Sequence, residues 1–101
     1  MRYLWLFLIL PLPALADTLC VTNASDTRHF FAVASDSGKR AADWLAPGAQ
    51  LCLDTKAPGT VSVYEEDDAF EGCSRRLPPG GAEQMHAYAP FDRCTWAVHL
   101  N

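Results

Sequence analysis

Turn-forming residues interrupt this chain at nearly regular intervals and leave no room for a long helix. Clusters rich in Gly, Pro, Asn, Asp and Ser recur between positions 23 and 92, and the runs between them are only five to seven residues long. In the run 94–100, every second residue is apolar. Turns about every 8–12 residues with short alternating runs are typical of an antiparallel β-sandwich or barrel. The alanine-rich runs 41–46 and 82–88 also suit short helical turns. The predicted fold is therefore all-β, with room for one short helix.

The first sixteen residues have the layout of a cleaved secretory signal peptide. Arg2 precedes an apolar run over 3–10, and small residues lead up to Ala16. Two prolines interrupt the run well before the roughly 20 apolar residues that a membrane helix needs. We therefore expect residues 1–16 to be removed and residues 17–101 to form a single exported domain. We expect that domain to be periplasmic or secreted, with no membrane association after cleavage.

All four cysteines lie in the predicted mature domain, at Cys20, Cys52, Cys73 and Cys94. No two of them are closer than 21 positions, whereas zinc sites are usually built from closely spaced pairs. An even number of cysteines in an exported chain predicts two disulfides. Three pairings are possible, and we favour Cys20–Cys52 with Cys73–Cys94. On the chain-entropy model each such crosslink stabilises the fold by roughly 3.5 kcal/mol.

The predicted mature domain is short and acidic. Its 85 residues carry seven Lys and Arg against twelve Asp and Glu. A single domain of this size buries only about 60–65% of the surface that its unfolded chain exposes, so crosslinks are an expected part of its stability. The negative balance argues against nucleic acid or an anionic membrane as a partner and permits a basic protein partner. We expect a monomer.

The first half of the mature domain resembles certain small secreted bacterial β-proteins of unknown function. The segments that carry the resemblance are "CVTNAS", "FFAVA" and "WLAPGAQLC", which span Cys20 to Cys52. In those proteins a Cys-x-x-Asn-x-Ser strand precedes an aromatic-rich strand and a Trp-x-x-Pro-Gly turn that leads to a second cysteine. The resemblance implies a β-sandwich held by a disulfide and brings no active site with it.

The most distinctive charged segment is the acidic run in "VYEEDDAFEGC", residues 63–73. A calcium-binding loop places oxygen ligands at alternate positions, whereas these four carboxylates are contiguous, and Ala69 and Phe70 occupy places where ligands are needed. Paired catalytic carboxylates must face each other across a cleft, which neighbouring loop residues do not do. The run is therefore typical of neither a calcium site nor a catalytic pair.

Two interpretations of the acidic run remain. The first is a solvated loop whose repelling charges keep a strand edge from pairing with another chain. The second is a docking patch, because aromatic residues flank the carboxylates, as is common in protein interfaces. The candidate partner-binding residues are Tyr64, Glu65, Glu66, Asp67, Asp68 and Phe70.

Other candidate chemistry is sparse. The chain has no nucleophile elbow, phosphate-binding loop or zinc-protease motif. Met85 and His86 are neighbours and offer ligand types that suit copper, but each histidine is isolated in the sequence. Asn23 begins an Asn-Ala-Ser glycosylation acceptor. Trp44 and Trp96 are expected to lie in the core or against a disulfide.

We therefore predict a non-enzymatic exported binding domain, a protein-interaction or inhibitor-like module that acts through its acidic aromatic loop. The alternative is a small accessory protein that binds copper or zinc through His and Met. No catalytic residue, cofactor-binding residue or metal ligand is assigned.

Overall fold

The computed structural model describes residues 17–69 and 71–100, so the predicted signal peptide and Phe70 lie outside the described residues. The described part of the chain is all-β, as predicted, with one short 3-10 helix. Its elements are β1 (Thr18–Asn23), β2 (His29–Ser35), β3 (Arg40–Leu45), β4 (Gln50–Asp54), β5 (Gly59–Tyr64), β6 (Cys73–Leu77), β7 (Ala82–Ala87), β8 (Thr95–Trp96) and the helix η3 (Ala97–Leu100). Within residues 17–69 and 71–100, no helix is long and apolar enough to cross a membrane.

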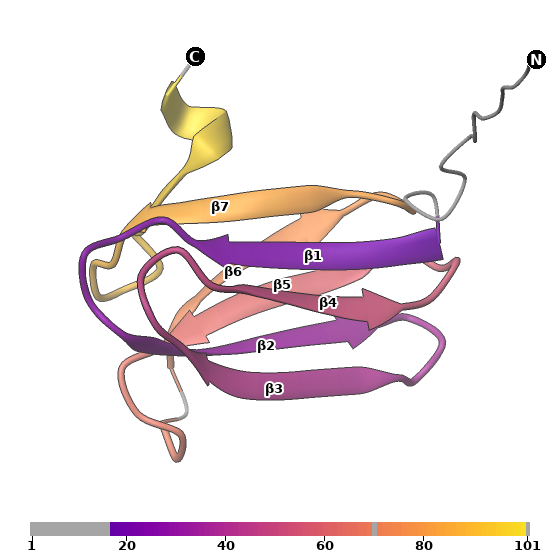
Figure 1. The fold of residues 1–101 in the computed structure, drawn as a ribbon, viewed down its shortest axis with the longest axis horizontal. Coiled ribbons are helices and arrows are strands. Elements are labelled where there is room, and N and C mark those ends of the chain that lie inside the picture. Colours follow the sequence, from indigo (N-terminus) through magenta and orange to yellow (C-terminus); the bar gives the residue numbers. More distant parts are fainter. Residues whose placement is uncertain (1–16, 70, 101) are drawn as a thin grey trace, which may run out of the picture.

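The strands form two four-stranded sheets that pack face to face as a sandwich (Figure 1). The β1 sheet has the order β4-β1-β7-β8, and the β2 sheet has the order β3-β2-β5-β6. Every strand pair is antiparallel except β1 with β7, which run in the same direction. Alternate residues of each strand point into the space between the sheets. In β2, for example, Phe31 and Val33 are fully buried while Phe30 and Ala34 face outward.

The core is made by inward-facing side chains from both sheets. Full burial of side chains of this size stabilises a fold by about 1.5–3 kcal/mol each. Trp96 is 2% exposed, which confirms its predicted place in the core, and it lies in register with Met85 of β7. The largest buried side chains are Trp96, Phe31, Leu19, Met85, Val21, Val33, Val61 and Val63.

Local preference and the observed structure differ at three segments. The runs 41–46 and 82–88, which also suited helical turns, coincide largely with strands β3 and β7. Pairing with β2 and β1 outweighs the helix preference of alanine there, since each strand completes a hydrogen-bonded ladder. Conversely, the alternating run 94–100 contains only two strand residues and then turns into η3. Inside that turn, the Trp96 N–H donates a 3.2 Å hydrogen bond to His99 Nδ1. Val98 and Leu100 are consequently exposed rather than inward-facing.

Both favoured cysteine pairings are confirmed. Cys20 of β1 is bonded to Cys52 at the directly opposite position of β4, and Cys73 of β6 is bonded to Cys94 just before β8. The second bond therefore links the two sheets. No free cysteine is present among the described residues. Two disulfides are consistent with an oxidising compartment outside the cytoplasm, because the cytosol keeps thiols reduced.

The connections between strands gather at two opposite ends of the sandwich (Figure 1). At the loop end, on the left of the view, lie residues 24–28, 46–49, 65–69, 71–72 and 88–94. At the turn end, on the right, lie the shorter connections 36–39, 55–58 and 78–81. The acidic run belongs to the loop end.

Candidate docking surface

The acidic loop comprises Glu65, Glu66, Asp67 and Asp68, and it projects away from both sheets (Figure 1). All four residues are exposed, and the Ala69 N–H donates a 3.2 Å hydrogen bond to the Glu66 carbonyl to close the turn. Among the described residues, none of the four carboxylates has a side-chain hydrogen bond or a salt bridge. Four adjacent negative charges without a cationic partner repel one another and attract cations from solution.

The potential metal ligands do not converge. Within residues 17–69 and 71–100, no group of three or more His, Cys, Asp or Glu side chains is placed to hold a metal ion. Met85 is fully buried in the core, whereas its neighbour His86 is only partly buried and borders an open depression. Consecutive residues of a strand point to opposite faces, so the two side chains are not arranged to share an ion.

Tyr64 belongs to a row of three aromatic side chains on the outer face of the β2 sheet. We call Trp44, Phe30 and Tyr64 the aromatic row, because they are paired in register across β3, β2 and β5. The Phe30 ring centroid is 5.5 Å from that of Trp44 and 6.5 Å from that of Tyr64. All three rings are partly buried, and the Arg28 guanidinium lies 4.5 Å from the Trp44 centroid. The prediction that Trp44 lies in the core is therefore wrong, since its position in β3 points outward.

Phe91 is a second aromatic side chain at the loop end, across a shallow depression from Tyr64, and no sequence motif marked it as a candidate site residue. It is 77% exposed, and its φ of 62° lies in the left-handed region that non-glycine residues rarely adopt. The next residue, Asp92, also has positive φ and accepts a 3.1 Å hydrogen bond from the Ser74 N–H. An open depression of about 360 Å³ lies between Tyr64 and Phe91, with Glu71 in its lining. The sequence "APFD" around Phe91 indicates a turn, but it does not indicate that Asp92 will form a hydrogen bond with Ser74 of β6.

His29 and Tyr88 form a stacked pair at the same end, with ring centroids 5.2 Å apart. Burial lowers the pKa of His29, while the nearby carboxylates of Glu65 and Asp26 act in the opposite direction. Burial raises the pKa of Tyr88, and the negative charges of Glu65 and Glu71 raise it further. The electric field of the acidic loop therefore reaches this stack, which borders an open depression of about 560 Å³.

The Asn23 side chain connects several segments of the loop end through buried hydrogen bonds. Its side chain is fully buried, and its amide nitrogen donates 2.8 Å hydrogen bonds to the carbonyls of Thr27 and Leu45. Its amide oxygen accepts hydrogen bonds from the N–H and the hydroxyl of Ser25. Both amide hydrogens are thus in use, so the glycosylation interpretation of Asn23 does not hold for the folded domain. The residue instead shapes the loop that precedes β2.

Comparison with known proteins finds no matching family model, no matching curated protein and no matching solved structure. Function is therefore inferred from the side chains of this chain alone.

Proposed function

We propose that this protein is a non-enzymatic exported binding domain that docks a basic protein partner at its loop end. The docking surface consists of the acidic loop together with Tyr64 and Phe91. The observation that supports the proposal is that four exposed carboxylates directly follow Tyr64, which borders with Phe91 a depression that is also lined by Glu71. Protein interfaces commonly combine aromatic residues with a polar, solvent-accessible rim, and the acidic loop would form part of that rim.

The carboxylates attract the partner and orient its approach. Exposed charges in salt solution act over about 10 Å at 0.1 M ionic strength, so they mainly set the rate of encounter. The charge balance of the whole chain has the same sign, with twelve acidic against eight basic residues. A basic partner is therefore drawn towards the loop end, whereas an acidic one is repelled.

The aromatic side chains hold the partner after the encounter. Phe91 exposes most of its ring, and Tyr64 borders the same depression, which leaves room for an apolar or cationic side chain of the partner. Aromatic residues often contribute much of the binding energy at such positions. The aromatic row extends this surface over the outer face of the β2 sheet, where the Arg28 guanidinium covers Trp44.

The exported location belongs to the same proposal. The apolar leader with small residues at its end is typical of a cleaved signal peptide, and the two disulfides suit an oxidising compartment. In such a compartment, this domain would act as an interaction or inhibitor module, and a small docking surface is sufficient for that role.

The test is affinity capture with matched variants. The mature domain is immobilised as wild type and as a variant with Glu65→Gln, Glu66→Gln, Asp67→Asn and Asp68→Asn, and each is incubated with exported proteins from the native source. We expect the wild type to retain a basic protein that the variant loses, as measured by quantitative mass spectrometry. Retention of the same proteins by both forms would overturn the proposed docking surface.

A further inference from the structure

The two disulfides differ in their access to solvent. Cys73 and Cys94 are 0% and 4% exposed, and their bond lies against the core between the sheets. Cys52, in contrast, is an exposed residue of β4, which forms the edge of the β1 sheet. Its partner Cys20 is 9% exposed. Of the four cysteines, Cys52 is therefore the most accessible to a molecule outside the domain.

The surroundings of Cys52 leave room for such a molecule. An open depression of about 400 Å³ adjoins the disulfide on the outer face of the β1 sheet. Besides the two cysteines, its lining consists of small or slender residues, namely Thr18, Gln50, Gly80, Gly81 and Ala82. No strand lies beyond β4 in the sheet order, so an approach from that side is unobstructed by the sheet.

We propose that Cys20–Cys52 is a site of thiol–disulfide exchange whose substrate is an external thiol, and that Cys73–Cys94 stays closed under the same conditions. The incoming thiolate attacks Cys52 Sγ, so a bond forms between these two sulfurs while the bond to Cys20 breaks. Cys20 Sγ leaves as a thiolate. The Thr18 hydroxyl oxygen lies 3.9 Å from this sulfur.

The exchange is completed when the reductant is a dithiol. Its second thiolate attacks its own sulfur in the mixed disulfide and releases Cys52 as a thiolate. The dithiol is thereby oxidised by two electrons, and Cys20 and Cys52 are reduced and take up protons from water. Access and thiolate character govern such rates, which is why the exposed bond reacts before the buried one.

The fold survives opening of this bond because other contacts hold the same strands. β1 and β4 are paired over five positions, and Leu19 and Val21 of β1 are fully buried in the core. The second disulfide still links the sheets. Reduction of Cys20–Cys52 therefore occurs in the folded domain and does not wait for global unfolding.

Selective reduction tests this proposal directly on the wild-type mature domain. The folded protein is treated with dithiothreitol, samples are quenched with iodoacetamide at increasing times, and the alkylated cysteines are located by peptide mass spectrometry. We expect Cys20 and Cys52 to be alkylated at least about tenfold faster than Cys73 and Cys94. Simultaneous alkylation of all four cysteines, or earlier alkylation of Cys73 and Cys94, would overturn the proposal.

The point of attack is tested with glutathione and with two matched variants. In the wild type, the glutathione adduct is expected on Cys52 rather than on Cys20. In Cys20→Ser and Cys52→Ser, the one remaining thiol of this pair is titrated with Ellman's reagent without denaturant, after near-ultraviolet circular dichroism has shown a native fold. We expect Cys52 to react about tenfold faster than Cys20. An adduct mainly on Cys20 would contradict the assigned order of attack, and it can be detected in the wild type even if a variant fails to fold.

Discussion

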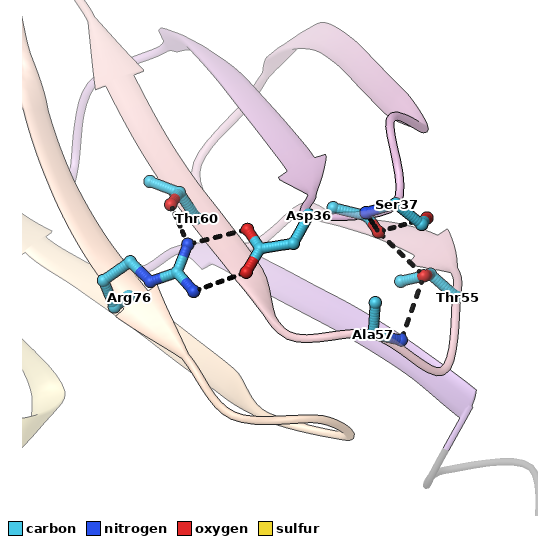
Figure 2. A network of polar contacts seen from close by, with 7 residues as sticks. Asp36, Ser37, Thr55, Ala57, Thr60 and Arg76 are labelled. Carbon is cyan, nitrogen blue, oxygen red and sulfur yellow. Dashed lines mark hydrogen bonds and ion pairs between the residues drawn. The ribbon is translucent and has the colours of Figure 1, made fainter.

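The two ends of the sandwich use polar side chains in opposite ways. At the turn end, Asp36 and Arg76 form a bidentate ion pair, in which Nη1 and Nη2 of the guanidinium donate to the two carboxylate oxygens at 2.9 and 2.8 Å (Figure 2). Arg76 also donates to the Thr60 hydroxyl. The hydrogen bond from Arg76 lowers the pKa of Asp36, so this carboxylate stays charged and paired into mildly acidic conditions. This ion pair therefore connects the turn after β2 to strand β6.

Hydroxyl groups at the turn end also form hydrogen bonds within the domain. The Ser35 hydroxyl lies 2.9 Å from that of Thr55 and 2.6 Å from that of Ser37, and Thr55 accepts a hydrogen bond from the Ala57 N–H (Figure 2). Ser35 and Thr55 are 7% and 8% exposed. Their hydrogen bonds therefore link the turn after β2 to the turn after β4 from within.

The loop end has a similar internal hydrogen-bond network at Asn23, but the four carboxylates of its acidic loop have no such partners among the described residues. The acidic loop extends into solvent without a salt bridge in the described part of the chain, and Phe91 is mostly exposed. The difference is between Asp36, whose carboxylate is paired within the domain, and the carboxylates of the acidic loop, which are not. The acidic-loop carboxylates are left available, which is the arrangement expected of a surface that binds another molecule.

The largest effect is expected from removing the crosslink that supports the loop end. Replacing both Cys73 and Cys94 with Ala should lower the free energy of unfolding by about 2–5 kcal/mol, because the unfolded chain regains entropy and two buried sulfurs are lost. Urea denaturation followed by tryptophan fluorescence measures the loss. The matched control replaces Cys20 and Cys52, whose sulfurs are less buried, and should cost less. An equal or larger cost for the control would mean that the loop end does not depend specially on its disulfide.

Asn23→Ala should have the next largest effect, a loss of about 2–3 kcal/mol. The change leaves the carbonyl of Leu45 buried without its donor and removes the hydrogen bonds that shape the loop before β2. Thr55→Ala is its counterpart at the turn end and should cost about 1–2 kcal/mol. Both values come from thermal or urea unfolding. If Asn23→Ala cost no more than Thr55→Ala, the loop end would not rely on this single residue for its internal order.

A smaller, pH-dependent effect is expected from His29. Because burial lowers the pKa of His29 in the folded domain, the unfolded chain binds the proton more readily. The stabilisation is present above the ordinary pKa of about 6.5 and is lost as the pH falls through the lower folded pKa. Unfolding measured from pH 8 to pH 5 should show this loss in the wild type and a flatter profile in His29→Gln. An unchanged profile in the variant would assign the pH dependence to other groups.

The smallest effect on stability is expected from the carboxylates themselves. Asp67→Asn with Asp68→Asn should change the free energy of unfolding by no more than about 0.5 kcal/mol, because these side chains are exposed and mutually repelling. The same pair should slow association with a basic partner and flatten its salt dependence. Phe91→Ala should instead speed dissociation. The matched control, Asp17→Asn with Asp54→Asn at the turn end, removes the same charge and should leave association nearly unchanged. Equal slowing by both pairs would show that only net charge matters.

Much of the architecture was predictable because it depends on short-range patterns. Regular turn signals and alternating runs are sufficient to indicate a β-sandwich, and the even cysteine count behind a predicted signal peptide indicates two disulfides. The weakest predictions concerned segments whose conformation depends on partners elsewhere. β3 and β7 needed their neighbouring strands, and the run 94–100 had too little paired length to remain a strand. The resemblance of residues 20–52 to small secreted bacterial β-proteins stays a prediction.

The candidate site likewise has some features that were predictable from the sequence and others that depend on tertiary contacts. The sequence by itself determined that four contiguous carboxylates follow Tyr64 in an exposed segment, because adjacent acidic side chains strongly disfavour burial. Tertiary structure decided what surrounds them. Phe30 and Trp44 lie beside Tyr64 only because three strands pair in register, and Phe91 reaches the same end only because residues 88–94 fold back against β6. Tertiary structure also decided that Cys52 is exposed while Cys73 is buried, although both are cysteines in short strands. Composition and spacing report local preference, whereas contact between distant residues depends on which strands become neighbours and on which face of a strand each side chain falls.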